Sequence, residues 1–126
     1  MQVRQSAEDY FETIYMLKKK NGSVRAIDVV NELGFSKPTV SVAMKKFREN
    51  GFVTVDDAGQ IELTAAGLAI AKKTFEKHTV ISEMLMMLGV PEEIALEDAC
   101  RMEHGLSEES FAAVKAYLEK IKEKTE

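Results

Sequence analysis

The stretch Gly34-Phe-Ser-Lys-Pro-Thr39 places a helix stop directly before a helix start. Gly34 follows an apolar helical pattern and readily adopts the left-handed conformation that ends a helix. Ser36 is a suitable N-cap, and Pro38 is tolerated in the first turn of the next helix. The chain therefore has to turn sharply between two helices, which predicts a helix-turn-helix.

The segments around this turn extend the prediction to a winged helix-turn-helix. Residues 5–20 and 26–33 read as two helices, and a third runs from Ser36 to Asn50. Two β-rich runs, 52–55 and 61–63, follow it and indicate a hairpin. Helix, helix, turn, helix and hairpin is the order in which the third helix enters the major groove of DNA.

The rest of the chain predicts three more helices. They cover residues 65–88, Pro91 to about His104, and Ser107 onward, with no Pro/Gly/Ser-rich linker before them. The expected fold is therefore mainly α with a small β-hairpin. We expect a winged helix-turn-helix DNA-binding domain over residues 1–64 and a helical domain over residues 65–126. A methionine-rich stretch (Met84, Met86, Met87) and the last helix suggest an apolar dimer interface.

Charge is divided unequally along the chain. Residues 1–50 hold nine Lys/Arg and six Asp/Glu, whereas residues 51–126 hold eight and fifteen, within an overall net charge of −4. A basic first half suggests contact with phosphates, and an acidic second half suggests another task.

Hydropathy and cysteine content point to the cytoplasm. No apolar run reaches the roughly 18 residues of a transmembrane helix, and the N-terminal residues lack the apolar segment of a secretory signal. One cysteine cannot form an internal disulfide, which fits a reducing compartment.

The predicted third helix presents hydroxyl and basic side chains on its outer face. Hydroxyls near a helix start suit base edges and phosphates, an exposed valine suits an apolar base contact, and cations suit the DNA backbone. The alternative is a merely solvated charged face. The candidate DNA-binding residues are Arg25, Ser36, Lys37, Pro38, Thr39, Ser41, Val42, Lys45, Lys46 and Arg48.

A second motif, Cys100-Arg-Met-Glu-His104, puts a thiol, a carboxylate and an imidazole at i, i+3 and i+4, on one face of a helix. Such a mixed donor set is typical of a transition-metal site. Asp9 and Glu12 share a face of the first helix, and His78 lies midway along the fourth. The candidate metal ligands are Asp9, Glu12, His78, Cys100, Glu103 and His104.

Each donor also has an ordinary structural explanation. Cys100 can be a small buried apolar residue, the acids of the first helix can favour its N-terminus, and His104 can cap a helix end. The alternative functions are a metal-independent winged-helix regulator that responds to a small molecule, a metalloenzyme, and a structural zinc protein. Six protein donors leave few open positions for catalysis, and structural zinc sites favour closed Cys/His tetrahedra.

The two motifs together resemble the diphtheria-toxin-repressor and manganese-transport-regulator family of metal-dependent repressors. The resemblance rests on Ser6-Ala-Glu-Asp-Tyr-Phe-Glu-Thr-Ile-Tyr15, Ser36-Lys-Pro-Thr-Val-Ser41 and Cys100-Arg-Met-Glu-His104. It implies a homodimer that binds a palindromic operator in double-stranded DNA when Fe²⁺ or Mn²⁺ occupies a site between the domains. Co²⁺, Ni²⁺ and Zn²⁺ are the expected substitutes. It implies neither an enzyme nor a membrane protein.

Position by position, the resemblance implies a hybrid ligand set. Asp9 and Glu12 match the manganese branch, Cys100 matches the iron branch, and the other three ligands are shared. Ser82, followed by Glu83, stands where a glutamate ligand of the iron branch is expected, which leaves the part of Glu83 in a second site open. Leu96 replaces a further histidine of that branch, and the SH3-like tail of longer members is not seen.

Overall fold

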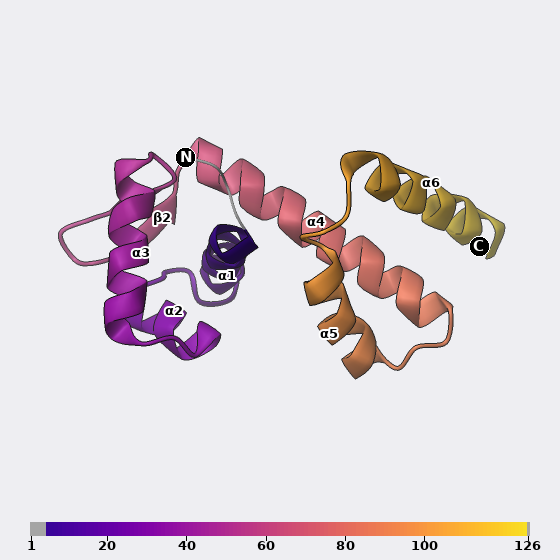
Figure 1. The fold of residues 1–126 in the computed structure, drawn as a ribbon, viewed down its shortest axis with the longest axis horizontal. Coiled ribbons are helices and arrows are strands. Elements are labelled where there is room, and N and C mark those ends of the chain that lie inside the picture. The colour runs from indigo at the N-terminus through magenta and orange to yellow at the C-terminus, as the bar shows by residue number, and fades with distance from the viewer. Residues whose placement is uncertain (1–4, 126) are drawn as a thin grey trace. The chain divides into compact units, whose positions relative to one another are not determined.

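The computed structural model describes residues 5–125 and is mainly helical, with one two-stranded antiparallel hairpin, as predicted (Figure 1). Its elements in chain order are α1 (Gln5–Asn21), α2 (Ala26–Leu33), α3 (Lys37–Glu49), β1 (Val53–Val55), β2 (Ile61–Leu63), α4 (Ala65–Met87), α5 (Glu92–Met102) and α6 (Glu108–Thr125). None of the helices described has both the length and the apolar character needed to cross a membrane.

Contacts divide the chain into two compact units. The first unit ends at Lys72 and the second begins at Lys73, so α4 contributes its start to one and its remainder to the other. The domain boundary expected after residue 64 remains a prediction.

The core of the first unit is built on aromatic rings. Phe11 of α1 is fully buried and meets Phe47 of α3 edge-on at 4.8 Å between ring centroids and Phe52 at 5.3 Å. Tyr10 packs edge-on against Phe47 at 5.3 Å, and burial raises the pKa of its phenol. These contacts hold α3 so that Val40, Met44 and Phe47 point inward, while its other residues, except the partly buried Ala43, are exposed to solvent.

The turn between α2 and α3 has the predicted chemistry. Gly34 has φ +73° and its N–H donates to the Val30 carbonyl, which ends α2. Ser36 Oγ accepts a hydrogen bond from the Thr39 N–H at 3.3 Å, which caps the start of α3.

The hairpin forms the wing and is tied to the body of the unit. β1 and β2 pair with Val53 opposite Leu63, and Asp56 Oδ1 accepts the N–H groups of Ala58 and Gln60 to shape the turn. The segment before α2 also pairs with the wing, because the Ile61 N–H donates to the Val24 carbonyl at 2.7 Å and Arg25 bridges to Gln60. This third extended segment was not predicted.

The start of α4 approaches the wing so closely that a side chain does not fit. A Cβ on Gly67 would lie 2.2 Å from the Phe52 carbonyl oxygen, well inside contact distance. Thr64 caps α4: its hydroxyl accepts a hydrogen bond from the Gly67 N–H and donates one to the Gly51 carbonyl.

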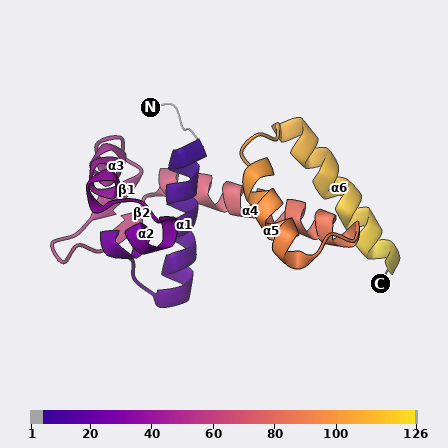
Figure 2. The ribbon, with the colours of Figure 1, turned by 60° about the horizontal axis from the view of Figure 1, so that its bottom comes forward.

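The second unit packs α5 and α6 against α4 (Figure 2). Val80 of α4 meets Phe111 and Leu118 of α6 in a small apolar core. Ion pairs also join α4 to α6: Lys73 and Lys77 with Glu108, Glu76 with Lys115, and Glu83 with Lys122.

Candidate metal centre and DNA-reading surface

Local sequence brings three metal-type donors together in the second unit. His78 projects from the middle of α4, while Cys100 lies in the last turn of α5 and Glu103 directly follows that helix. Ala95 and Ala99 are fully buried, so the face of α5 that carries them is turned inward. The small alanine side chains allow a close approach of the helix, which positions its C-terminal end beside His78.

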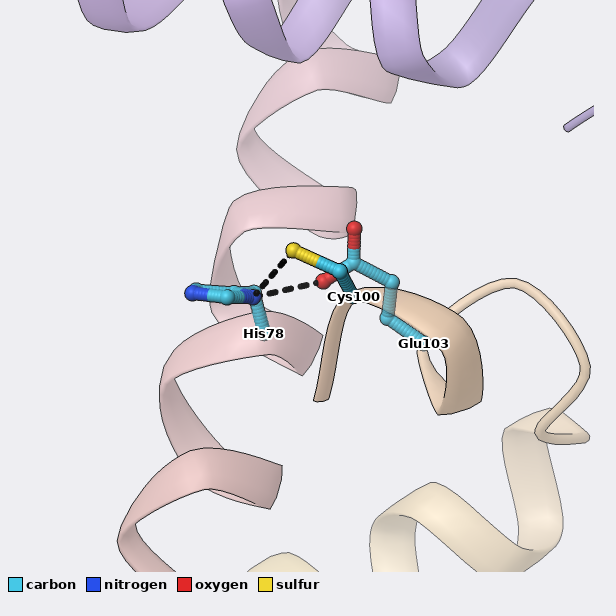
Figure 3. A group of neighbouring side chains, drawn as sticks. All are labelled: His78, Cys100 and Glu103. Atoms are coloured by element: carbon cyan, nitrogen blue, oxygen red, sulfur yellow. Dashed lines mark hydrogen bonds and ion pairs between the residues drawn. The ribbon is translucent and has the colours of Figure 1, made fainter. Parts of the chain in front are cut away.

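The three side chains converge on one point (Figure 3). His78 Nδ1 lies 3.0 Å from Glu103 Oε2 and 3.7 Å from Cys100 Sγ. One donor atom from each residue lies within 4.8 Å of the other two. His104 adds a second imidazole, because its Nε2 lies 3.3 Å from Glu103 Oε1.

Burial shows that this cluster is built into the unit. The side chains of Glu103 and His104 are 1% and 4% exposed, and that of His78 is 17% exposed, whereas Cys100 is exposed. A buried carboxylate is costly unless it is paired or coordinated. Here His78 Nδ1 is hydrogen-bonded to Glu103 Oε2, whereas the atoms Glu103 Oε1 and His104 Nε2 are buried without a hydrogen bond in the described part of the chain, as donors for a metal ion would be.

The donor set fits a divalent transition ion. Ligand bonds of about 2.0–2.3 Å place neighbouring donors on one ion roughly 3–4.6 Å apart. The separations of 3.0 and 3.7 Å from His78 Nδ1 to Glu103 Oε2 and Cys100 Sγ fall in that range. Thiolate, imidazole and carboxylate together suit Fe²⁺, Co²⁺, Ni²⁺ or Zn²⁺, and the imidazole and carboxylate also suit Mn²⁺.

The predicted geometry needs one correction. We expected Cys100, Glu103 and His104 on one face of a single helix, but α5 ends at Met102. Glu103 keeps helical dihedral angles as the C-cap, and the Gly105 N–H bonds to the Met102 carbonyl in a tight turn. His104 therefore reaches Glu103 from a turn and not from the helix.

Two candidate ligands belong to the first unit. Asp9 and Glu12 lie three positions apart on α1, with Glu12 buried and Asp9 partly buried. Their part in a metal site stays a prediction. Glu83 is paired with Lys122 of α6.

The candidate DNA-binding residues lie on the surface of the first unit. Along α3 the inward residues are Val40, Met44 and Phe47, and the candidates on this helix are all exposed. Ser36 and Thr39 join hydroxyls at 2.8 Å at its start. Arg25 is also exposed, and its backbone is held beside the wing by the pairing with Gln60 and by a bond from its N–H to Asp28. That pairing is the feature the sequence prediction missed, and the β-branched Val24 was its only signal.

Comparison with known families covers both halves of the chain. Residues 2–59 match the family model described as "Iron dependent repressor, N-terminal DNA binding domain". Residues 64–126 match "Iron dependent repressor, metal binding and dimerisation domain".

Similar proteins carry related names. The chain is 36% identical over 95% of its length to an uncharacterized HTH-type transcriptional regulator of Methanocaldococcus jannaschii, 98% of which is covered. It is 35% identical over 93% of its length to the transcriptional regulator MntR of Escherichia coli O6:H1, of which 76% is covered.

Solved structures share the fold. The manganese regulator SloR superposes with a TM-score of 0.78 at 26% identity over 94% of this chain. A manganese-dependent transcriptional repressor in complex with manganese gives 0.81 at 25% identity over 89%. The chain spans only about half the length of these two, 55% and 52%.

The members of the matched family are transcriptional regulators and not enzymes, which removes the metalloenzyme alternative. On two family models that together span residues 2–59 and 64–126, and on relatives at 35–36% identity, this chain belongs to the iron-dependent repressor family of metal-dependent transcriptional regulators.

Proposed function

We propose that this protein is a repressor that binds a palindromic operator as a homodimer when Fe²⁺ or Mn²⁺ is bound, and so controls metal-ion homeostasis in the cytoplasm. The observation that carries the proposal is the convergence of His78, Cys100 and Glu103 in a chain whose other unit matches a DNA-binding domain. The relatives named MntR and the manganese-bound repressor structure support metal dependence.

In this proposal the metal is held by residues of both units. His78, Cys100, Glu103 and His104 supply donors from the second unit, and Asp9 and Glu12 supply carboxylates from α1. A bound divalent ion supplies the positive charge that keeps a thiolate and several carboxylates together. Cys100 has to lose its proton and the histidines have to be neutral, so metal binding should release protons and weaken in acid.

The DNA step follows from how α1 and α3 are joined. Tyr10 and Phe11 of α1 pack on Phe47 of α3. Any restriction on the position of α1 therefore also restricts α3, the helix that would enter the major groove (the reading helix). Donors on α1 that engage the second unit would therefore fix the position of α3 in each protomer. The effect is a shift between existing conformations. To change the ratio of binding-competent to incompetent protein from 1:99 to 99:1, the metal must bind the competent conformation more favourably by roughly 5.5 kcal/mol.

The homodimer is supported by an apolar groove in the second unit. It has a volume of about 400 Å³ and is lined by residues of α4 and α6, among them Met84, Met87 and Tyr117, and by Leu88, which directly follows α4. Leu88 and Tyr117 are 74% and 66% exposed. Apolar surface of this kind commonly marks a protein–protein interface.

A titration of operator binding against single metals tests the proposal. Duplex DNA selected by the wild-type protein is titrated anaerobically with Mn²⁺, Fe²⁺, Co²⁺ and Zn²⁺ in turn. We expect tight binding only with metal, and no response to metal in the Cys100→Ala/Glu103→Ala double variant. Asp98→Asn is the matched control, because Asp98 lies on α5 but pairs with Arg101. Equal affinity with and without metal would favour the metal-independent regulator.

A further inference from the structure

One large apolar side chain on the reading helix is not explained by the fold. Val42 of α3 is 70% exposed, whereas Val40 on the same helix and Val24 and Val29 beside it are fully buried. Exposing an apolar side chain to this extent is unfavourable in water. Its exposure indicates that Val42 is suited to a contact outside the first unit.

The surroundings of Val42 restrict what that contact can be. Its neighbours one helical turn away are Pro38 on one side and Lys45 and Lys46 on the other, all of them exposed. Val42 is therefore an apolar residue on an exposed face of α3 that becomes basic toward the C-terminal end of the helix. A nucleic acid fits this pattern better than an apolar protein surface, because two lysines would lose hydration against the latter without gaining an anion.

Among the groups that DNA offers in its major groove, the C5 methyl of thymine is the apolar one. Valine in a helix holds mostly one χ1 rotamer, so its two methyl groups are presented with little loss of side-chain freedom. The lysines nearby can bind phosphates but carry no sequence information. We infer that Val42 is a specificity-determining residue that packs against a thymine methyl group in each operator half-site. The inference rests on the proposed function, since it requires α3 to enter the groove.

The test removes the methyl groups of the Val42 side chain and the methyl group of the thymine, first separately and then together. The probe is a duplex selected from a random library by the wild-type protein with Mn²⁺, in which each thymine is replaced in turn by deoxyuridine. At one thymine of each half-site we expect the replacement to weaken wild-type binding about fourfold, the value of one buried methyl group. In Val42→Ala the same replacement should have no further effect.

Two further variants keep the result interpretable. Lys46→Ala should weaken binding to every duplex and lower its salt dependence while retaining the response to deoxyuridine, as expected for a phosphate contact. Val42→Thr keeps the shape and one methyl group of the side chain and should show an intermediate response. Because Val42 is exposed, neither of its variants should alter folding.

The outcomes separate this inference from the proposed function. Should wild type and Val42→Ala respond equally to deoxyuridine at every thymine, or should neither respond, the inference is overturned while metal-dependent binding still stands. Selection of no duplex in the presence of metal would overturn both.

Discussion

The two units of this chain are stabilised in different ways. The first has a core of interlocking aromatic rings, in which Phe11 is fully buried against Phe47 and Phe52. The second has a small apolar core around Val80 and relies also on exposed ion pairs and on a carboxylate, Glu103, buried among histidines. Exposed ion pairs contribute little stability, about 0–1 kcal/mol each. Under the proposed function, bound metal and a partner protomer would therefore contribute more to the stability of the second unit than to that of the first.

Phe11→Ala should have the largest effect, because it opens a cavity in the aromatic core. We expect a loss of about 3–5 kcal/mol in the free energy of unfolding, measured by urea denaturation. Phe35→Ala is the control. Phe35 also contacts Tyr10, at 5.7 Å, but is 41% exposed, and its loss should cost less than about 1.5 kcal/mol. Similar losses for the two variants would contradict the importance of the buried aromatic core.

Metal should stabilise the protein through the second unit. With free Mn²⁺ at about 100 times its dissociation constant, the free energy of unfolding should rise by about 2.7 kcal/mol, visible as a higher Tm. Glu103→Gln keeps the size of the buried side chain but removes its charge, and should abolish the rise. Asp98→Asn should keep it. A rise that survives in Glu103→Gln would place the metal elsewhere.

The apolar groove offers a test of dependence on a partner. Leu88→Glu combined with Tyr117→Glu should raise the dimer dissociation constant at least about 30-fold, since Tyr at an interface is often worth about 2 kcal/mol or more. Sedimentation measures this directly. Ile27→Glu changes a residue of the first unit that is 43% exposed and should leave the dimer intact. A double variant that still dimerises as wild type would exclude the groove as the interface.

The smallest effect concerns the ion pairs of the second unit. The hydrogen bond from Lys73, aided by Lys77, lowers the pKa of Glu108 below its ordinary value of 4.5. Its folded pKa is thus below its unfolded one, so the stabilisation is present above about pH 4.5 and is lost as pH falls through the folded pKa.

Glu108→Gln should therefore be slightly less stable than wild type at neutral pH and equally stable in strong acid. Because Glu108 is exposed, about 1 M salt should remove most of the difference. Denaturation curves across this pH range provide the measurement. A difference that grew in acid would contradict the assignment.

The sequence predicted the helix-turn-helix well because its signals are local. Gly34 and Ser36 act through the backbone of their own turn, and both have the expected conformations. The pairing of Arg25 with Gln60 was not predicted, since a single bridge between residues 35 positions apart leaves almost no pattern.

The candidate metal centre was predicted only in part. The residue types in Cys100-Arg-Met-Glu-His104 indicated the chemistry, but the end of α5 at Met102 and the pairing of His78 with Glu103 depend on packing between helices. The choice between iron and manganese stays open for a chemical reason. Cys100 favours the softer ion, whereas Asp9 and Glu12 favour the harder one.

A crystal structure grown with Mn²⁺ or Fe²⁺, with the ion located by anomalous scattering, tests the central claim most directly. The account predicts a peak bounded by His78 and Glu103, with Cys100 or the carboxylates of α1 completing the shell. A peak remote from these residues, or donors that point apart around an empty gap at saturating metal, would contradict it.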